Sequence, residues 1–331
     1  MDVKLLKLNP GSLSHAELES FFWEVVDSVE LSERCWIDVE NSRKVVDDLI
    51  EKGETVYGLN TGFGLLANKK ISTEDLAKLQ INLVRSHSAG TGALLDSQIV
   101  RLIMLLKATS LARGFSGIRK DAIQLLMECI NRNWIPSIPE KGSVGASGDL
   151  APLAHLSLAL VGEGEFLPAD GMSNRAQPVL AKQLFEEHCV QPLQLEAKEG
   201  LALLNGTQVS TALAIAALYR AKRTFRAALI VGALSVDAAK GSDTPFDARI
   251  HEIRNHQSQI KCAELYRKLL AGSKIRDSHR DCSRVQDPYS LRCQPQVMGA
   301  CLNSLEHAAS VLIDEANAVS DNPLVFSDDG S

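Results

Sequence analysis

Residues 142–149 read GSVGASGD, a loop sequence whose composition permits an unusual reaction of the backbone. Its three glycines allow φ > 0 and close backbone approach, and prolines shortly before it oppose regular structure. In a bent loop, the amide nitrogen of Gly148 could attack the carbonyl carbon of Ala146. Loss of two waters would leave an imidazolone ring, with Ser147 converted to an exocyclic methylene. The product would be an electrophile that no coded side chain supplies.

A plain connector before a helix is the alternative for such a glycine- and serine-rich loop. The segment does not read G-x-x-x-x-G-K-[ST], which excludes a P-loop. Asp149 replaces the last glycine of G-x-S-x-G, which excludes a nucleophile elbow. The longer run GSVGASGDLAPLAH closely resembles the signature of ammonia-lyases that carry a methylidene-imidazolone (MIO) group. This resemblance implies that Ala146, Ser147 and Gly148 form the MIO group and that no external cofactor is needed.

Two further loops resemble motifs of the same family. Tyr57 in YGLNTGFG resembles the tyrosine that acts as base for the β-proton, a role that requires a lowered phenol pKa. A turn tyrosine with a solvated hydroxyl is the alternative. Asn205 in LLNGTQ resembles the asparagine that orients the substrate near the MIO group, and it could also cap a helix.

The segment VQDPYSLRCQPQV matches a family active-site segment residue by residue. The resemblance implies that Arg292 binds the substrate carboxylate, a task for which its planar, two-pronged guanidinium suits it better than lysine. It places Tyr289 near the MIO ring and the substrate amine, and Gln286 nearby as a hydrogen-bonding group. Ordinary loop residues and a solvated surface arginine are the alternatives.

His87 in SHSAG lies where the family selects its amino acid. Phenylalanine-directed members carry an aromatic or apolar residue there, histidine-directed members carry Ser-His, and tyrosine-directed members also use a histidine. A lone histidine after a helix is more often structural. The closeness of YGLNTGFG, LLNGTQ and QDPYSLRCQPQ to histidine ammonia-lyases favours a carbon–nitrogen lyase that converts L-histidine to trans-urocanate and ammonia. Three alternatives stay open: a tyrosine or phenylalanine ammonia-lyase or aminomutase, a non-catalytic assembly protein whose loop never matures, and a catalytically incomplete fragment.

Helical patterns surround these loops. A capping box at Ser14 predicts a helix to about residue 29, and Asp149 can cap the apolar helix that follows it. Further helices are expected at residues 38–52, 74–86, 97–113, 117–133, 209–240, 247–270 and 294–319. A turn at 168–171 and a loop at 272–289 separate some of them.

Few stretches alternate as strands do, so the fold class is mostly α, with long antiparallel helices in a bundle. The resemblance implies a fumarase/aspartase-like architecture. Residues 1–200 are expected to form a helical and loop region that carries the tripeptide. Residues 201–331 are expected to form the central long-helix bundle.

Composition limits the partners. A net charge of −6 with scattered basic residues disfavours nucleic acid and anionic membranes. Basic residues interrupt the apolar pattern at 209–240, which favours a buried helix over a membrane span. The N-terminal sequence resembles no export signal, so a cytoplasmic location is expected. Seven cysteines without C-x-x-C and eight histidines without H-E-x-x-H indicate reduced thiols and no bound metal.

The family resemblance also implies an assembly. Family members form homotetramers whose active sites draw residues from several subunits around a central helical bundle. They continue past SDNPLVF with further long helices and active-site residues. The sequence is therefore expected to lack a C-terminal part of the family's length.

Overall fold

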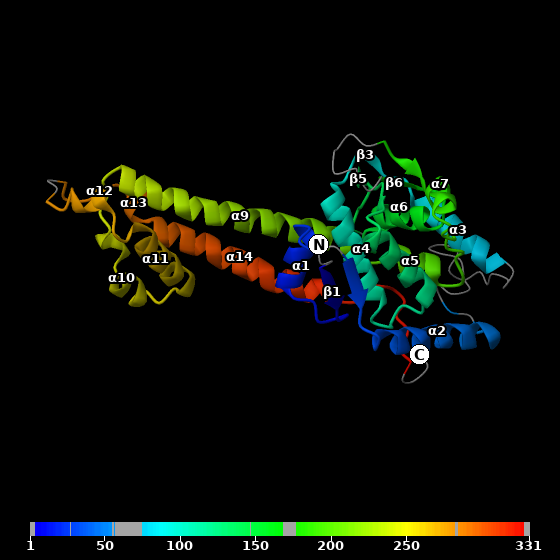
Figure 1. The fold of residues 1–331 in the computed structure, drawn as a ribbon. Coiled ribbons are helices and arrows are strands. Elements are labelled where there is room, and N and C mark those ends of the chain that lie inside the picture. Colours follow the sequence, from blue (N-terminus) through cyan, green and yellow to red (C-terminus); the bar gives the residue numbers. More distant parts are fainter. Residues whose placement is uncertain are drawn as a thin grey trace. The chain divides into compact units, whose positions relative to one another are not determined.

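The computed structural model describes residues 4–26, 28–54, 56, 75–145, 147–167, 177–281 and 284–327. The chain divides into two compact units, residues 1–214 with 313–331, and residues 215–312. Both are mainly helical, which confirms the predicted fold class (Figure 1).

The first unit contains short strands among its helices. Its elements are β1 (Leu5–Leu8), α1 (His15–Phe22), β2 (Ser28–Leu31), α2 (Cys35–Glu51), α3 (Leu76–His87), β3 (Thr91–Leu94), α4 (Ser97–Leu111), α5 (Lys120–Asn131), β4 (Ile135–Pro136), β5 (Pro139–Lys141), α6 (Leu150–Leu160), β6 (Glu165–Leu167), β7 (Val179–Leu180), α7 (Ala181–Glu187) and α8 (Glu199–Leu204). Two long helices, α9 (Gln208–Ala238) and α14 (Gln294–Ala316), each contribute residues to both units. The predicted helices at 38–52, 74–86, 97–113, 117–133, 209–240 and 294–319 correspond to α2, α3, α4, α5, α9 and α14.

The predicted capping box is present at the start of α1. The Ser14 hydroxyl accepts from the Glu17 N–H at 3.3 Å, and the Glu17 carboxylate accepts from the Ser14 N–H at 2.7 Å. The helix ends at Phe22, so the expected extension to residue 29 is wrong. Glu24 adopts a φ of 58°, which breaks the helix, and the chain continues into β2, which pairs in parallel with β1.

Helix α4 is the centre of the first unit, because every residue from Ile99 to Leu111 is buried. Full burial of one Leu or Ile side chain contributes about 1.5–3 kcal/mol. Two charged residues share this environment and need partners. Arg101 donates to Asn133 Oδ1 at 2.9 Å and lies over the Phe21 ring at 5.1 Å. The other is Lys107, whose partner lies in the candidate site.

Small antiparallel sheets position the loops of the first unit. Strand β3 pairs with β5, with Thr91 opposite Lys141 and Leu94 opposite Pro139. A second sheet has the order β4-β6-β7. Because β3 follows the SHSAG turn and β5 precedes the GSVGASGD loop, their pairing brings these two loops together.

The second unit packs around an apolar cluster between helices. The cluster consists of Leu229, Ala233, Val236, Phe246, Cys262, Tyr266 and Leu270, with Phe225, Leu291, Met298 and Leu302 packed against it. Gly232, toward the end of α9, accepts through its carbonyl from Gln294 at the start of α14, at 3.4 Å. The two helices therefore run antiparallel within this unit (Figure 1). Among the described residues, none of the helices has both the length and the apolarity that a membrane span requires.

The single helix expected at 247–270 is wrong. The chain forms a short 3-10 turn (Thr244–Phe246), α10 (Ala248–Glu252) and α11 (Gln257–Leu270) instead. Asn255 interrupts the helix with a φ of 59°. The expected loop at 272–289 contains the short helix α12 (Lys274–Asp277), and α13 (Tyr289–Arg292) begins at its end. The expected turn at 168–171 lies outside the described residues.

Candidate active site

Two described residues of the tripeptide loop adopt unusual backbone conformations. Ser147 and Gly148 have φ values of 63° and 90°, both left-handed. The left-handed conformation costs a residue with a side chain, such as Ser147, about 1–2 kcal/mol of conformational free energy. Ala146, the third residue of the tripeptide, lies outside the described residues.

Gly148 packs directly on the backbone of Gly206, with which it forms an isolated parallel bridge. A Cβ atom at position 148 would lie 2.4 Å from the Gly206 carbonyl oxygen and 2.9 Å from the Gly206 nitrogen. Only glycine fits there. The loop is therefore pressed against the LLNGTQ segment at the very residue whose nitrogen would attack.

Asp149 secures this packing, but in a different way from the one expected. It precedes α6, yet its carboxylate makes no capping hydrogen bond to that helix. The buried carboxylate instead accepts from the Ser143 hydroxyl at 2.6 Å, from the Ser210 hydroxyl at 2.6 Å and from the Ser210 N–H at 2.8 Å. Ser210 lies in the first turn of α9, so Asp149 caps α9. Its own N–H donates to the Gly206 carbonyl at 2.8 Å.

Asn205 ends helix α8 and is almost fully buried. Its backbone N–H donates to the Leu201 carbonyl at 2.9 Å, so it does cap this helix through the main chain. Its side-chain Nδ2 donates to the Asn322 carbonyl at 2.7 Å. This bond fixes the amide plane of a residue that directly precedes Gly206, the glycine on which Gly148 packs.

His87 is the last residue of α3 and is half-buried. Its Nδ1 lies 2.8 Å from the Leu83 carbonyl and 3.0 Å from the Ser86 hydroxyl. A hydrogen bond to the carbonyl, which can only accept, requires the tautomer with the proton on Nδ1. In the neutral ring Nε2 is then an acceptor. Helix α3 is also tied to the turn after α6, because Arg85 donates to both carboxylate oxygens of Glu163, at 2.6 and 2.8 Å.

His155 is a positioning residue that the sequence reasoning missed. Its Nε2 accepts from the Gly90 N–H at 3.0 Å, which ties the loop after His87 to the helix after the tripeptide. Burial lowers the pKa of His155, in keeping with a neutral acceptor ring. The residue is part of GSVGASGDLAPLAH, so the motif contained a signal. Its partner, however, lies 65 residues away in the sequence.

The first unit contains four of the predicted residues, namely His87, Ser147, Gly148 and Asn205. The packing of Gly148 on Gly206 joins the tripeptide loop to the segment of Asn205, and the Gly90–His155 bond joins the loop after His87 to α6. The remaining described candidates, Gln286, Tyr289 and Arg292, belong to the second unit. Tyr57, like Ala146, lies outside the described residues.

The second unit orders its three candidates around helix α13. The Arg292 guanidinium lies over the Tyr289 ring at 4.3 Å, and its Nε donates to the Asp287 carbonyl at 3.1 Å. The Asp287 carboxylate in turn accepts from the Ser242 N–H at 2.6 Å. Tyr289 is 72% exposed, and Gln286 is exposed as well. Arg292 itself is half-buried, and its contacts with Tyr289 and Asp287 fix the orientation of its guanidinium within this unit.

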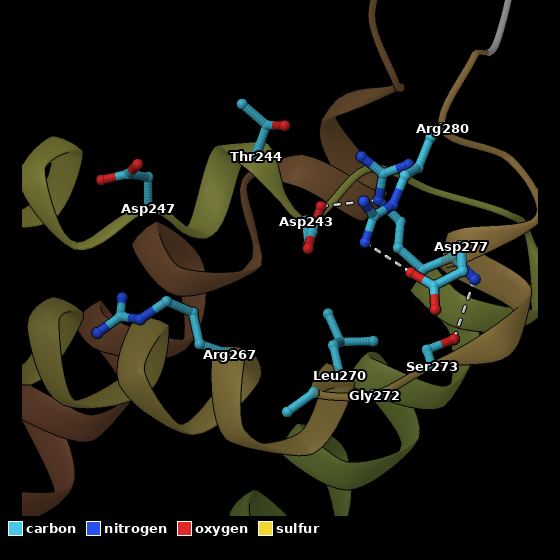
Figure 2. A pocket seen from close by; sticks show the side chains of 11 residues that line it. Asp243, Thr244, Asp247, Arg267, Leu270, Gly272, Ser273, Asp277 and Arg280 are labelled. Atoms are coloured by element: carbon cyan, nitrogen blue, oxygen red, sulfur yellow. Dashed lines mark hydrogen bonds and ion pairs between the residues drawn. The ribbon is translucent and has the colours of Figure 1, made fainter.

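A large open cavity of about 650 Å³ also lies in the second unit, but it does not coincide with these candidates (Figure 2). None of the described site candidates lines it. Four of its charged side chains pair with one another, since Arg276 binds Asp243 at 2.7 Å and Arg280 binds Asp277 at 2.8 Å. Within the described ranges, no cluster of His, Cys, Asp or Glu side chains is placed to hold a metal ion.

Comparison with known protein families shows to which family the chain belongs. The family described as "Aromatic amino acid lyase" matches residues 13–331. The chain belongs to this aromatic amino acid lyase family. It is similar to the histidine ammonia-lyase of Legionella pneumophila (strain Corby), with 53% identity over 98% of the chain and 63% of that relative. It is 51% identical to the histidine ammonia-lyase of Idiomarina loihiensis, over 98% of the chain and 62% of that protein.

Solved structures of lyases and aminomutases share the fold of this family member. Phenylalanine aminomutase of Pantoea agglomerans superposes with a TM-score of 0.89 at 28% identity, over 98% of the chain and 65% of that protein. Histidine ammonia-lyase from Trypanosoma cruzi gives 0.85 at 35% identity, over 98% of the chain and 60% of that protein. The chain thus spans a little less than two thirds of the length of these relatives.

Proposed function

We propose that the protein is a histidine ammonia-lyase that converts L-histidine to trans-urocanate and ammonia. The contact that carries this proposal is the packing of Gly148 on Gly206, because it holds the backbone bent at the tripeptide and leaves no room for any side chain. The similarity to histidine ammonia-lyases at 51–53% identity supports histidine as the substrate.

The described residues of the loop fit an MIO group formed from Ala146, Ser147 and Gly148. Gly148 offers an unhindered nitrogen, Ser147 offers the hydroxyl to be eliminated, and Asp149 anchors the segment to α9. The MIO group supplies an electrophilic methylene that makes the substrate amine a better leaving group. No external cofactor is needed in this proposal.

The other proposed residues bind and orient the substrate or move its proton. Arg292 binds the carboxylate in a bidentate manner, and Tyr289 and Gln286 form hydrogen bonds near the amine. The amide of Asn205 orients the substrate beside the tripeptide. Tyr57 removes the β-proton, which is weakly acidic and therefore requires a positioned base.

His87 selects the side chain of the amino acid. Because its Nδ1 proton is committed to the Leu83 carbonyl, Nε2 can accept from the N–H of a substrate imidazole. A phenol could donate to the same atom, so this contact favours histidine and tyrosine over phenylalanine. The overall similarity to histidine ammonia-lyases then favours histidine.

We further propose a homotetramer in the cytoplasm, without nucleic acid or membrane partners. Support comes from exposed apolar side chains on α9 and α14 in the second unit, such as Leu234, Val297 and Val311. Residues 1–200 as the tripeptide region and 201–331 as the bundle region also stay a prediction.

The substrate assignment is tested by the ultraviolet absorbance of the products. The purified protein is given L-histidine, L-tyrosine and L-phenylalanine separately, and urocanate, coumarate and cinnamate are followed. Urocanate should form with the highest kcat/KM. Faster formation of coumarate or cinnamate, or of a β-amino acid, would assign the protein to a different member of the family.

A further inference from the structure

Lys107 is a buried cation in the middle of α4, only 1% exposed. Its Nζ donates to the backbone carbonyl of Asn205 at 2.6 Å. Burial lowers the pKa of Lys107 to about 8, while the charge of Asp321 opposes this shift and that of Lys198 adds to it. Burial of a charged ammonium group costs free energy unless the group is hydrogen-bonded, so the partner of Lys107 is of interest.

The bond that Lys107 makes acts on a rigid plane. The carbonyl of Asn205 and the nitrogen of Gly206 belong to one planar peptide group, so fixing the oxygen at one end fixes the nitrogen at the other. That nitrogen is one of the atoms against which Gly148 packs, 2.9 Å from where a Cβ of Gly148 would stand. A small rotation of the plane would therefore move the surface on which the tripeptide is bent.

The side chain of Asn205 is held by a separate set of contacts. Its Nδ2 donates to the Asn322 carbonyl, and the Asn322 N–H donates to the Asp321 carboxylate at 2.7 Å. Asp321 is paired with Lys198 at 2.8 Å, and both side chains are almost fully buried. Lys198 and Asp321 thus act on the amide side chain, whereas Lys107 acts on the peptide plane.

We propose that Lys107 is a positioning residue for formation of the MIO group. By holding the Asn205–Gly206 plane against Gly148, it keeps the loop bent for ring closure. A bond forms between the Gly148 nitrogen and the Ala146 carbonyl carbon. The Ala146 oxygen leaves as water with the protons of the Gly148 and Ser147 nitrogens. The Ser147 hydroxyl leaves as a second water with its α-hydrogen. This inference rests on the proposed function.

The test is the intact mass of the freshly purified protein, measured over time. Lys107→Met removes the donor, and Lys107→Gln leaves a polar group one atom too short to reach the carbonyl. Both variants should lose the two waters more slowly than the parent, by up to about a hundredfold. Small misplacements of reacting groups can lower a reaction rate by about this factor. Lys107→Arg keeps a donor and should restore much of the rate.

A double variant serves as the matched control. Lys198→Met with Asp321→Asn removes the neighbouring buried pair, whose opposite effects on the pKa of Lys107 are lost together, and keeps the bond to the peptide plane. Its mass loss should follow that of the parent while KM rises. Equal mass loss in Lys107→Met and the parent would overturn the proposal, as would failure of both the Met and Gln variants to fold. A parent protein that never loses two waters would instead refute the proposed function itself.

Discussion

At the scale of single residues, the candidate site depends on positions where one added atom cannot be accommodated. Gly148 meets the Gly206 backbone, and its φ of 90° is also unfavourable for any other residue. Gly145, three positions earlier, has a φ of 67°, but an added Cβ atom there would have no neighbouring atom within 4 Å. Both glycines have a positive φ, but only at Gly148 would an added Cβ atom also clash with a neighbouring residue.

Gly148→Ala should abolish the loss of two waters, because the new methyl group would displace the Gly206 carbonyl from the loop. Gly145→Ala is the matched control, since it carries only the cost of a left-handed alanine, about 1–2 kcal/mol. Intact mass of both purified variants distinguishes them. A normal mass loss in Gly148→Ala would show that close packing at Gly206 is dispensable.

Arg292 allows a second prediction at this scale. Arg292→Lys should lower kcat/KM by on the order of 1.5–3 kcal/mol in transition-state binding, because lysine lacks the bidentate donor pair. Arg249→Lys, at an exposed arginine of α10 paired with Asp247, is the control and should change little. If the two variants show equal kcat/KM on L-histidine, Arg292 does not bind the substrate.

At the scale of elements, side chains from distant parts of the sequence hold the loops in place. Asp149 fastens the loop before α6 to the start of α9, and His155 fastens the loop after α3 to α6. The sequence predicted most helices, because their apolar periodicity is local. It missed these two contacts because their partners lie 61 and 65 residues away. The strands of two to four residues were also too short to produce an alternating pattern.

His155 gives the first unit a dependence on pH. Because burial lowers its pKa in the folded state, the unfolded chain binds more protons as the pH falls below about 6.5, the ordinary value for histidine. Stability should therefore decline on acidification through this range. The buried His251 of the second unit has a pKa lowered mainly by burial and acts in the same direction.

His155→Gln should weaken this pH dependence while retaining an acceptor for the Gly90 N–H. Thermal unfolding of the parent and the variant between pH 7.5 and 5.5 measures the difference, with about 6.5 as the reference point. His307→Gln, on an exposed position of α14, is the control and should follow the parent. An unchanged slope in His155→Gln would remove this histidine from the acid sensitivity.

At the scale of the whole molecule, the exposed apolar side chains of α9 and α14 are the surfaces that the proposed tetramer would cover. Val231 and Leu234 are 59% and 65% exposed, unusual values for large apolar residues in the middle of a helix. The family resemblance predicted a tetramer, and periodicity predicted the helices, but neither could show which faces stay uncovered. The exposed faces become known only from the structure, which shows which side chains of α9 and α14 pack inside the second unit.

Val231→Glu combined with Leu234→Glu should prevent formation of the proposed tetramer, since two buried carboxylates in each copy would lack partners. Light scattering after size-exclusion chromatography reports the mass in solution, and circular dichroism checks that the helices persist. Lys268→Glu, which changes the charge by the same amount at an exposed side chain of α11, should leave the assembly unchanged. A tetramer from the double glutamate variant would place the interface elsewhere.

The most direct test of the proposed chemistry is intact mass spectrometry of the purified protein beside its Ser147→Ala variant, with urocanate formation followed on the same samples. The parent should be two waters lighter than its sequence mass and should produce urocanate. The variant should keep its full sequence mass and lose activity by several orders of magnitude, because alanine has no hydroxyl to eliminate. A parent of full sequence mass that still forms urocanate, or a Ser147→Ala variant with near-normal turnover, would contradict the proposal.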